Sequence, residues 1–187
     1  DLHMGYRKAK LVPISCNDER ILVLRQQYAL RMLALFQTGR RIINIDESWL
    51  NQSRFIRKVW VPTNAQATFT DKQIEPRISL ITAFDTNGKL WWALTQANTN
   101  TNVMSMFLNQ LVSLLDQDQP GWEEDSVILL DNASWHRSAV MMKILARMNL
   151  PIIFSGPFSY SAAAVETVFA HLKFGDLNPE KLPTGKK

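Results

Sequence analysis

Apolar side chains recur at spacings of three and four along residues 19–38, which is the period of one face of an α-helix. The stretch reads ERILVLRQQYALRMLALFQT, with the periodic positions at Ile21, Leu24, Tyr28, Met32 and Leu35. Asp18 stands before it as a candidate N-cap, and Gly39 follows it as a C-terminal stop. The pattern therefore predicts a leading amphipathic helix over residues 19–38.

Short apolar runs separated by polar, proline and glycine positions follow this helix and predict β-strands. The first is Ile-Ile-Asn-Ile at residues 42–45, and the segments RKVWVP and RISLITAFD come next. The turn sequence from Asp85 to Lys89 then leads into LWWALTQ, as in a β-hairpin. Together these segments predict a meander of three neighbouring antiparallel strands.

The second half of the chain alternates helical and strand patterns. The expected elements are a helix at 102–116, a strand at 126–130, a helix at 138–148, a strand at 152–154 and a helix at 162–174. This order predicts an α/β fold whose mixed central sheet, the meander plus two parallel strands, is flanked by helices. Residues 176–187 are expected to form a frayed C-terminal tail.

The composition narrows the class of protein. The 187 residues are 46% hydrophobic, which is enough for a sizeable core. No apolar run approaches the roughly 18 to 20 residues of a membrane span, and the first residues lack the apolar segment of a secretory signal. The single cysteine, Cys16, excludes an internal disulfide and a cysteine-cluster zinc site. We expect a soluble intracellular protein with no membrane partner.

Charge is distributed unevenly along the chain. Residues 1–58 carry 11 Lys and Arg against 5 Asp and Glu, whereas the remainder carries 10 against 12. A basic N-terminal third suits a polyanion partner, although solvated helix faces have the same composition. Residues 1–18 show little periodicity, and we interpret them as a basic arm that continues from a preceding region.

Three carboxylates stand where one edge of the predicted sheet would gather them. Asp46 follows the apolar run at 42–45, Asp131 follows the run at 126–130, and Glu166 lies early in the last predicted helix, beside its apolar stripe. Open α/β sheets place ligands at the C-terminal ends of their strands. Taken alone, Asp46 is equally well explained as a turn cap. Glu47 is the local competitor, although alternation along a strand points it to the other side.

Carboxylates that converge repel one another unless cations neutralise them. Hard oxygen ligands select Mg²⁺ or Mn²⁺ over zinc, and a pair of such ions is suited to in-line displacement at phosphorus. We therefore interpret Asp46, Asp131 and Glu166 as catalytic metal ligands of a phosphoryl-transfer enzyme.

Three stretches of the chain, IINIDESWLN, VILLDNASWHRS and GPFSYSAAAVETVFAHLK, resemble the catalytic domain of mariner-superfamily cut-and-paste DNA transposases. The resemblance spans about residues 6–173 and includes the spacing of 34 residues between Asp131 and Glu166. It implies a ribonuclease H-like catalytic domain over residues 19–175. It also implies two Mg²⁺ ions, replaceable by Mn²⁺, with Asp46 bridging both ions while Asp131 and Glu166 hold one each.

By the same resemblance, the partner is double-stranded DNA, both transposon ends and target, bound by a homodimer in the nucleus. Hydrolysis would free the ends, whose 3′-hydroxyls would then attack the target at the same site. We expect residues 1–18 to be the linker from an N-terminal DNA-binding region. The candidate phosphate contacts are Arg7, Lys8, Lys10, Arg54, Arg57, Lys58 and His136. For His136, a structural hydrogen bond is an equal alternative.

One segment departs from the family pattern. Where the family reads Pro-Asp-Leu-Asn-Pro before the last acid, this chain reads Tyr-Ser-Ala-Ala-Ala at residues 160–164. Ala163 replaces an asparagine that could cap or orient the loop. Two alternatives therefore stay open: a domesticated, non-catalytic DNA-binding protein with the same fold, and a stand-alone nuclease.

Overall fold

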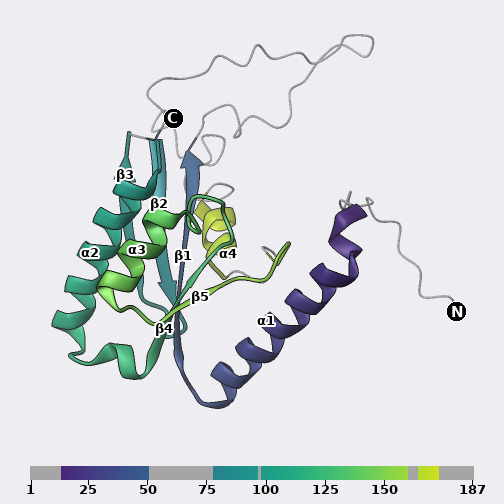
Figure 1. Cartoon of the computed structure of the whole chain (residues 1–187). Helices are drawn as coiled ribbons and strands as arrows, with labels where there is room; N and C mark the ends of the chain where they lie inside the picture. Colours follow the sequence, from purple (N-terminus) through teal and green to yellow (C-terminus); the bar gives the residue numbers. More distant parts are fainter. Residues whose placement is uncertain (1–13, 51–77, 97, 160–163, 173–187) are drawn as a thin grey trace, which may run out of the picture.

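A computed structural model describes residues 14–50, 78–96, 98–159 and 164–172. These residues form one sheet in the strand order β3-β2-β1-β4-β5, with helices on both faces (Figure 1). The strands are β1 (Arg41–Leu50), β2 (Ile78–Asp85), β3 (Leu90–Thr95), β4 (Ser126–Leu130) and β5 (Ile152–Phe154). β1, β2 and β3 are antiparallel neighbours, while β4 and β5 run parallel to β1. The predicted mixed sheet is confirmed.

β1 is longer than the apolar run that predicted it. It continues past Ile45 to Leu50 because β2 pairs with it along this whole extension, with Asp46 opposite Thr82 and Leu50 opposite Ile78. Asp46 and Glu47 therefore lie within the strand and not in a turn after it. The segment RKVWVP, which contributed to the predicted meander, lies outside the described residues.

One face of the sheet carries a continuous apolar core beneath α2 (Thr101–Asp118) and α3 (Ala139–Met148). Alternation along β1 sends Ile43 and Ile45 into this core. Both α2 and α3 are capped by the side chain of the residue that precedes them. The Asn100 side chain accepts two backbone N–H bonds at the start of α2, and Ser138 accepts one at the start of α3.

The opposite face carries two smaller apolar clusters. Ile42, Val127, Leu129 and Ile153 pack against α1 (Glu19–Gln37), and Leu80 packs with Val165 and Phe169 of α4 (Ala164–His171). Between the two clusters, β1 presents Asn44 and Asp46. The core on this face is therefore interrupted by polar side chains.

The leading helix is confirmed, but its surroundings differ from those of an ordinary amphipathic helix. None of the residues of α1 is buried, and Leu30 and Leu33 are 60% and 53% exposed. Asp18 precedes the helix without making the expected side-chain cap bond, whereas Gly39 ends it with φ +67°, a conformation that favours glycine. Among the described helices, none has the length and apolar character needed to cross a bilayer.

Candidate active site

The register of the sheet brings two of the predicted acids side by side. Asn44 of β1 is paired with Leu129 of β4 in parallel orientation. Asp46 lies two residues further along β1, and Asp131 is the residue directly after β4, so the two acids come close together. α4 supplies the third acid, because Val165 and Phe169 are buried against the sheet and Glu166 stands between them in the first turn.

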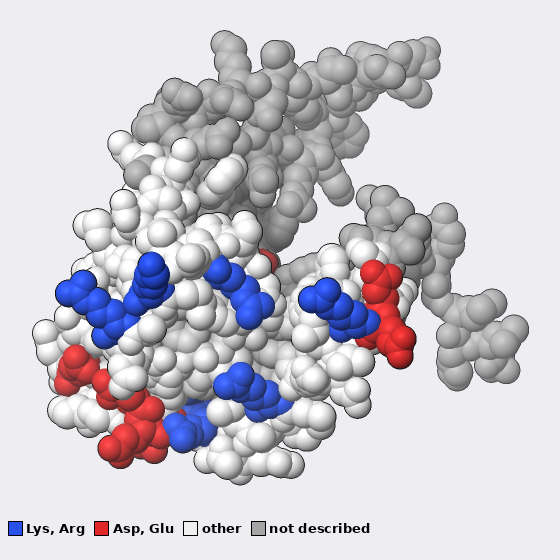
Figure 2. Space-filling view, viewed as in Figure 1, with Lys and Arg blue, Asp and Glu red and all other residues white. Residues whose placement is uncertain are grey.

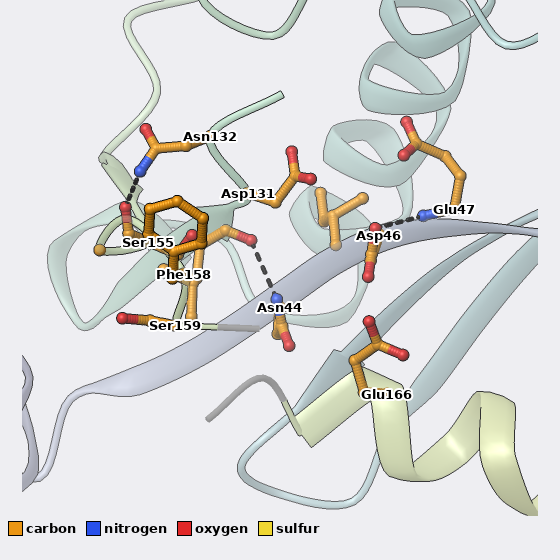
Figure 3. A pocket seen from close by; sticks show the side chains of 12 residues that line it. Asn44, Asp46, Glu47, Asp131, Asn132, Ser155, Phe158, Ser159 and Glu166 are labelled. Atoms are coloured by element: carbon orange, nitrogen blue, oxygen red, sulfur yellow. Dashed lines mark hydrogen bonds between the residues drawn. The ribbon is translucent and has the colours of Figure 1, made fainter. Parts of the chain in front are cut away.

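All three acids border one cavity of about 270 Å³ (Figure 3). Asp46 and Glu166 face each other across it, and Asp131 enters from the end of β4. The loop after β5, residues 155–159, forms another wall. Within this loop Phe158 has φ +55°, a backbone conformation that few non-glycine residues adopt.

The carboxyl group of Asp46 is in an unfavourable environment for its charge. Burial, together with repulsion from Glu47, Asp131 and Glu166, raises its pKa to about 7. The backbone N–H of Glu47, which donates to Asp46 Oδ1 at 2.8 Å, offsets only part of this. A cation bound in the cavity would relieve the repulsion.

The carboxyl group of Asp131 is in the opposite situation. Burial raises its pKa, but a hydrogen bond from His136 Nδ1 and another from the backbone N–H of Ala133, at 2.9 Å, outweigh burial and leave the pKa below its usual range. Asp131 therefore stays ionised beside Asp46. The pKa values of the two aspartates are shifted in opposite directions because Asp131 has the imidazole of His136 as a partner and Asp46 does not.

His136 occupies a fully buried position between two carboxylates. Its Nδ1 bonds Asp131, and its Nε2 lies 3.3 Å from Glu47 Oε1 in a close ion pair. Burial alone would lower its pKa, but the two carboxylates raise the pKa to about 9. The structure gives His136 two carboxylate partners at a buried position, which is the structural role that the sequence left open beside a phosphate contact. Glu47 points to this side of β1, as alternation predicted.

Side chains that the sequence analysis did not select complete the walls of the cavity. Asn44 lies on its floor, and Asn132 donates from Nδ2 to the Ser155 carbonyl while accepting from Arg137 at 3.0 Å. Asn132 thus ties the end of β4 to the loop after β5. For Asn44 the signal was visible in the sequence as one polar residue within an isoleucine run.

The remaining predicted DNA contacts, Arg7, Lys8, Lys10, Arg54, Arg57 and Lys58, lie outside the described residues. Figure 2 shows one face, where the Lys and Arg side chains form separate groups and acidic side chains gather near the end of α2. No residue of α2 borders the cavity among the described residues.

The donor set suits a hard divalent cation. Three carboxylates border a cavity large enough for hydrated ions, and their mutual repulsion favours cation binding. In the described part of the chain, however, no three carboxylate, imidazole or thiol groups are drawn together as a closed metal site. The acids surround the cavity and do not converge on one point.

This mixed sheet, flanked by helices, with Asp46 within β1 and Asp131 directly after β4, has the ribonuclease H-like fold. The family described as DDE superfamily endonuclease matches residues 41–184. The chain belongs to this family.

Solved structures show the same fold. The Mos1 mariner paired end complex with Mn has a TM-score of 0.67 at 20% identity, covering 92% of this chain and 54% of that one. The corresponding complex with Mg also has a TM-score of 0.67, at 17% identity, with coverages of 92% and 54%. The catalytic domain of Mos1 mariner transposase has a TM-score of 0.62 at 16% identity, covering 88% and 76%. This chain thus spans about half the length of the transposase chains in those complexes. No curated protein matches it.

Proposed function

We propose that this chain is the catalytic domain of a mariner-type DNA transposase. It cuts phosphodiester bonds at transposon ends and transfers the resulting 3′-hydroxyls into target DNA. The observation that carries the proposal is the meeting of Asp46, Asp131 and Glu166 around one cavity in a chain of the DDE superfamily endonuclease family. The solved complexes of Mos1 with Mn, with Mg and with transposon ends support it by likeness of fold.

The three acids would hold Mg²⁺ or Mn²⁺, two ions in each site. When bound, such ions activate the attacking hydroxyl and stabilise the leaving oxygen. The protein itself contributes placement and charge. His136 keeps Asp131 ionised and oriented, Asp46 supplies a charge that requires a cation nearby, and Glu166 remains exposed at the rim, where a DNA strand can approach. By resemblance, we further propose a homodimer on double-stranded DNA and a nuclear location.

The test is nicking of supercoiled plasmid in Mn²⁺ by the parent chain and by Asp46→Asn and Glu166→Gln. Each substitution removes a charge with little change in volume, so we expect nicking to fall by a factor on the order of 10³ without loss of thermal stability. Asp118→Asn is the matched control, because Asp118 is half-exposed, pairs with Lys89 and lies away from the cavity. It should nick like the parent. Equal nicking by all four proteins would overturn the assignment.

A second candidate is a domesticated DNA-binding protein, which the altered sequence at residues 160–164 favours. Absence of nicking by the full-length protein on its own transposon ends would support it. A stand-alone nuclease is separated by its products, since it yields hydrolysed ends without joining a 3′-hydroxyl to a new strand.

A further inference from the structure

Asn44 is a buried amide in the middle of β1. It is 6% exposed and sits in the run Ile42, Ile43, Asn44, Ile45, on the face of the sheet that carries the cavity. A buried amide without partners costs folding free energy, so the bonds it makes explain why it is tolerated.

The Asn44 side chain makes one bond in each of two directions. Its Nδ2 donates to the backbone carbonyl of Leu129 in β4 at 3.3 Å. Its Oδ1 accepts the backbone N–H of Val165 in α4 at 3.2 Å. One side chain on β1 therefore links β4 and α4.

These partners lie next to the three acids. Asn44 is two residues before Asp46 on β1, Leu129 is two residues before Asp131, and Val165 directly precedes Glu166. The amide thus joins the three backbone segments that carry the acids, close to where each acid emerges.

The start of α4 differs from the starts of α2 and α3. Those helices are capped by Asn100 and Ser138, the residues immediately before them. The sequence before Val165 is Ala162-Ala163-Ala164, whose side chains carry no hydrogen-bond acceptor. For the Val165 N–H, the acceptor comes instead from β1, 121 residues away in sequence.

The apolar contacts of α4 are less directional than a hydrogen bond. Val165 and Phe169 pack against Leu80, which fixes the face of the helix but leaves a non-directional contact. A hydrogen bond to the first turn is directional, so it limits sliding of the turn that carries Glu166.

We propose that Asn44 is a positioning residue that fixes the first turn of α4, and with it Glu166, beside Asp46 and Asp131. This inference rests on the proposed function, in which the three acids hold the metal. It assigns to a strand residue the capping task that Ala163 cannot perform.

The test compares the parent chain with Asn44→Leu, which keeps the volume and removes both bonds, and with Asn44→Ser, which stays polar but is too short to span both partners. Ile128→Val is the control. Ile128 is fully buried in β4 and packs into the core on the opposite face, so its loss lowers stability without touching α4.

Three quantities are measured at a temperature where circular dichroism shows every protein folded. The first is hydrogen exchange of the Val165 amide, the second is Mn²⁺ binding by titration calorimetry, and the third is kcat and KM for plasmid nicking. For both Asn44 variants we expect at least tenfold faster exchange at Val165, at least tenfold weaker Mn²⁺ binding, and a fall in kcat that exceeds any rise in KM. Ile128→Val should match the parent in all three.

The outcomes distinguish this inference from the proposed function. If the parent nicks and binds Mn²⁺ and the Asn44 variants do so equally well, the positioning role is overturned while the function stands. If the parent neither nicks nor binds Mn²⁺, the function fails and the positioning role fails with it. Should Asn44→Leu not fold, Asn44→Ser decides, and unchanged Val165 exchange in that variant also overturns the inference.

Discussion

The two faces of the sheet are built from the same strands but differ in the continuity of their cores. On the α2 and α3 face, one apolar cluster runs without interruption from β1 to Leu145. On the α1 and α4 face, Asn44 and Asp46 separate one cluster from another. The candidate site lies in that gap. We expect the intact face to carry most of the stability, so that the interrupted face can bury the repelled carboxylate of Asp46.

Truncating the intact face should have the largest effect on stability. Leu108 is fully buried in α2, so Leu108→Ala is expected to lower the free energy of unfolding by about 2–5 kcal/mol through lost burial and a cavity. Chemical denaturation measures this loss. Leu114→Ala, on the same helix at a position 41% exposed, is the control and should cost far less. Below its melting temperature the Leu108 variant should keep the parent kcat. A loss of kcat in the folded variant would contradict the expectation that this face contributes stability and the other face carries the site.

His136 is a buried polar residue at the edge of the otherwise apolar α2 and α3 face. Its replacement tests whether this polar residue also contributes to stability. His136→Gln removes the cationic imidazole between Asp131 and Glu47, and we expect the free energy of unfolding to fall by about 1–3 kcal/mol because the largely buried Glu47 loses its charged partner. Thermal and chemical denaturation report the change. His171→Gln, at an exposed position in the last turn of α4, serves as the matched control. Equal stability of the two variants would show that the ion pairs of His136 do not stabilise the folded protein.

The loop after β5 is a closely packed part of the interrupted face. A Cβ at Gly156 would lie 2.8 Å from Ser159 Oγ and 3.0 Å from Tyr28 Cδ1, so Gly156→Ala should displace the loop and cost about 1–2 kcal/mol. Nicking should fall as well, because the loop borders the cavity. Unchanged stability together with unchanged nicking would show that the loop adapts freely.

The smallest effect is expected on the outer side of α1. Leu30→Gln should change the free energy of unfolding by no more than about 0.5 kcal/mol, because the side chain is already 60% exposed. Met32→Gln on the same helix should cost more, since Met32 packs on the cluster of Ile42 and Val127. Chemical denaturation measures the free energy of unfolding of the two variants. A larger decrease for Leu30→Gln than for Met32→Gln would mean that the exposed side of α1 contributes more to stability than the side packed on the sheet.

Much of this architecture was predictable because its signals are local. Helical periodicity and apolar runs indicated the element order, and Asp46, Asp131 and Glu166 stood out as acids beside apolar segments. What was not predictable depends on partners that are distant in sequence. The extension of β1 needs β2, and the ionised state of Asp131 needs the ring of His136. Asn44 was visible as an irregularity, but its partners Leu129 and Val165 could not be read from the chain.

The position of α4 after the other described elements has a consequence for synthesis. β1 leaves the ribosome before β4, and β4 can align Asp131 beside Asp46 once it has emerged, but Glu166 comes only with α4, which follows the other described elements. The long chain segment between β1 and α4 adds little to the entropy cost of bringing them together, because that cost rises slowly with segment length. What separates Glu166 from the two aspartates is therefore the time at which it is synthesised. Under the proposed function, a chain that stops before α4 would hold two aspartates without Glu166 and would therefore lack the cutting site.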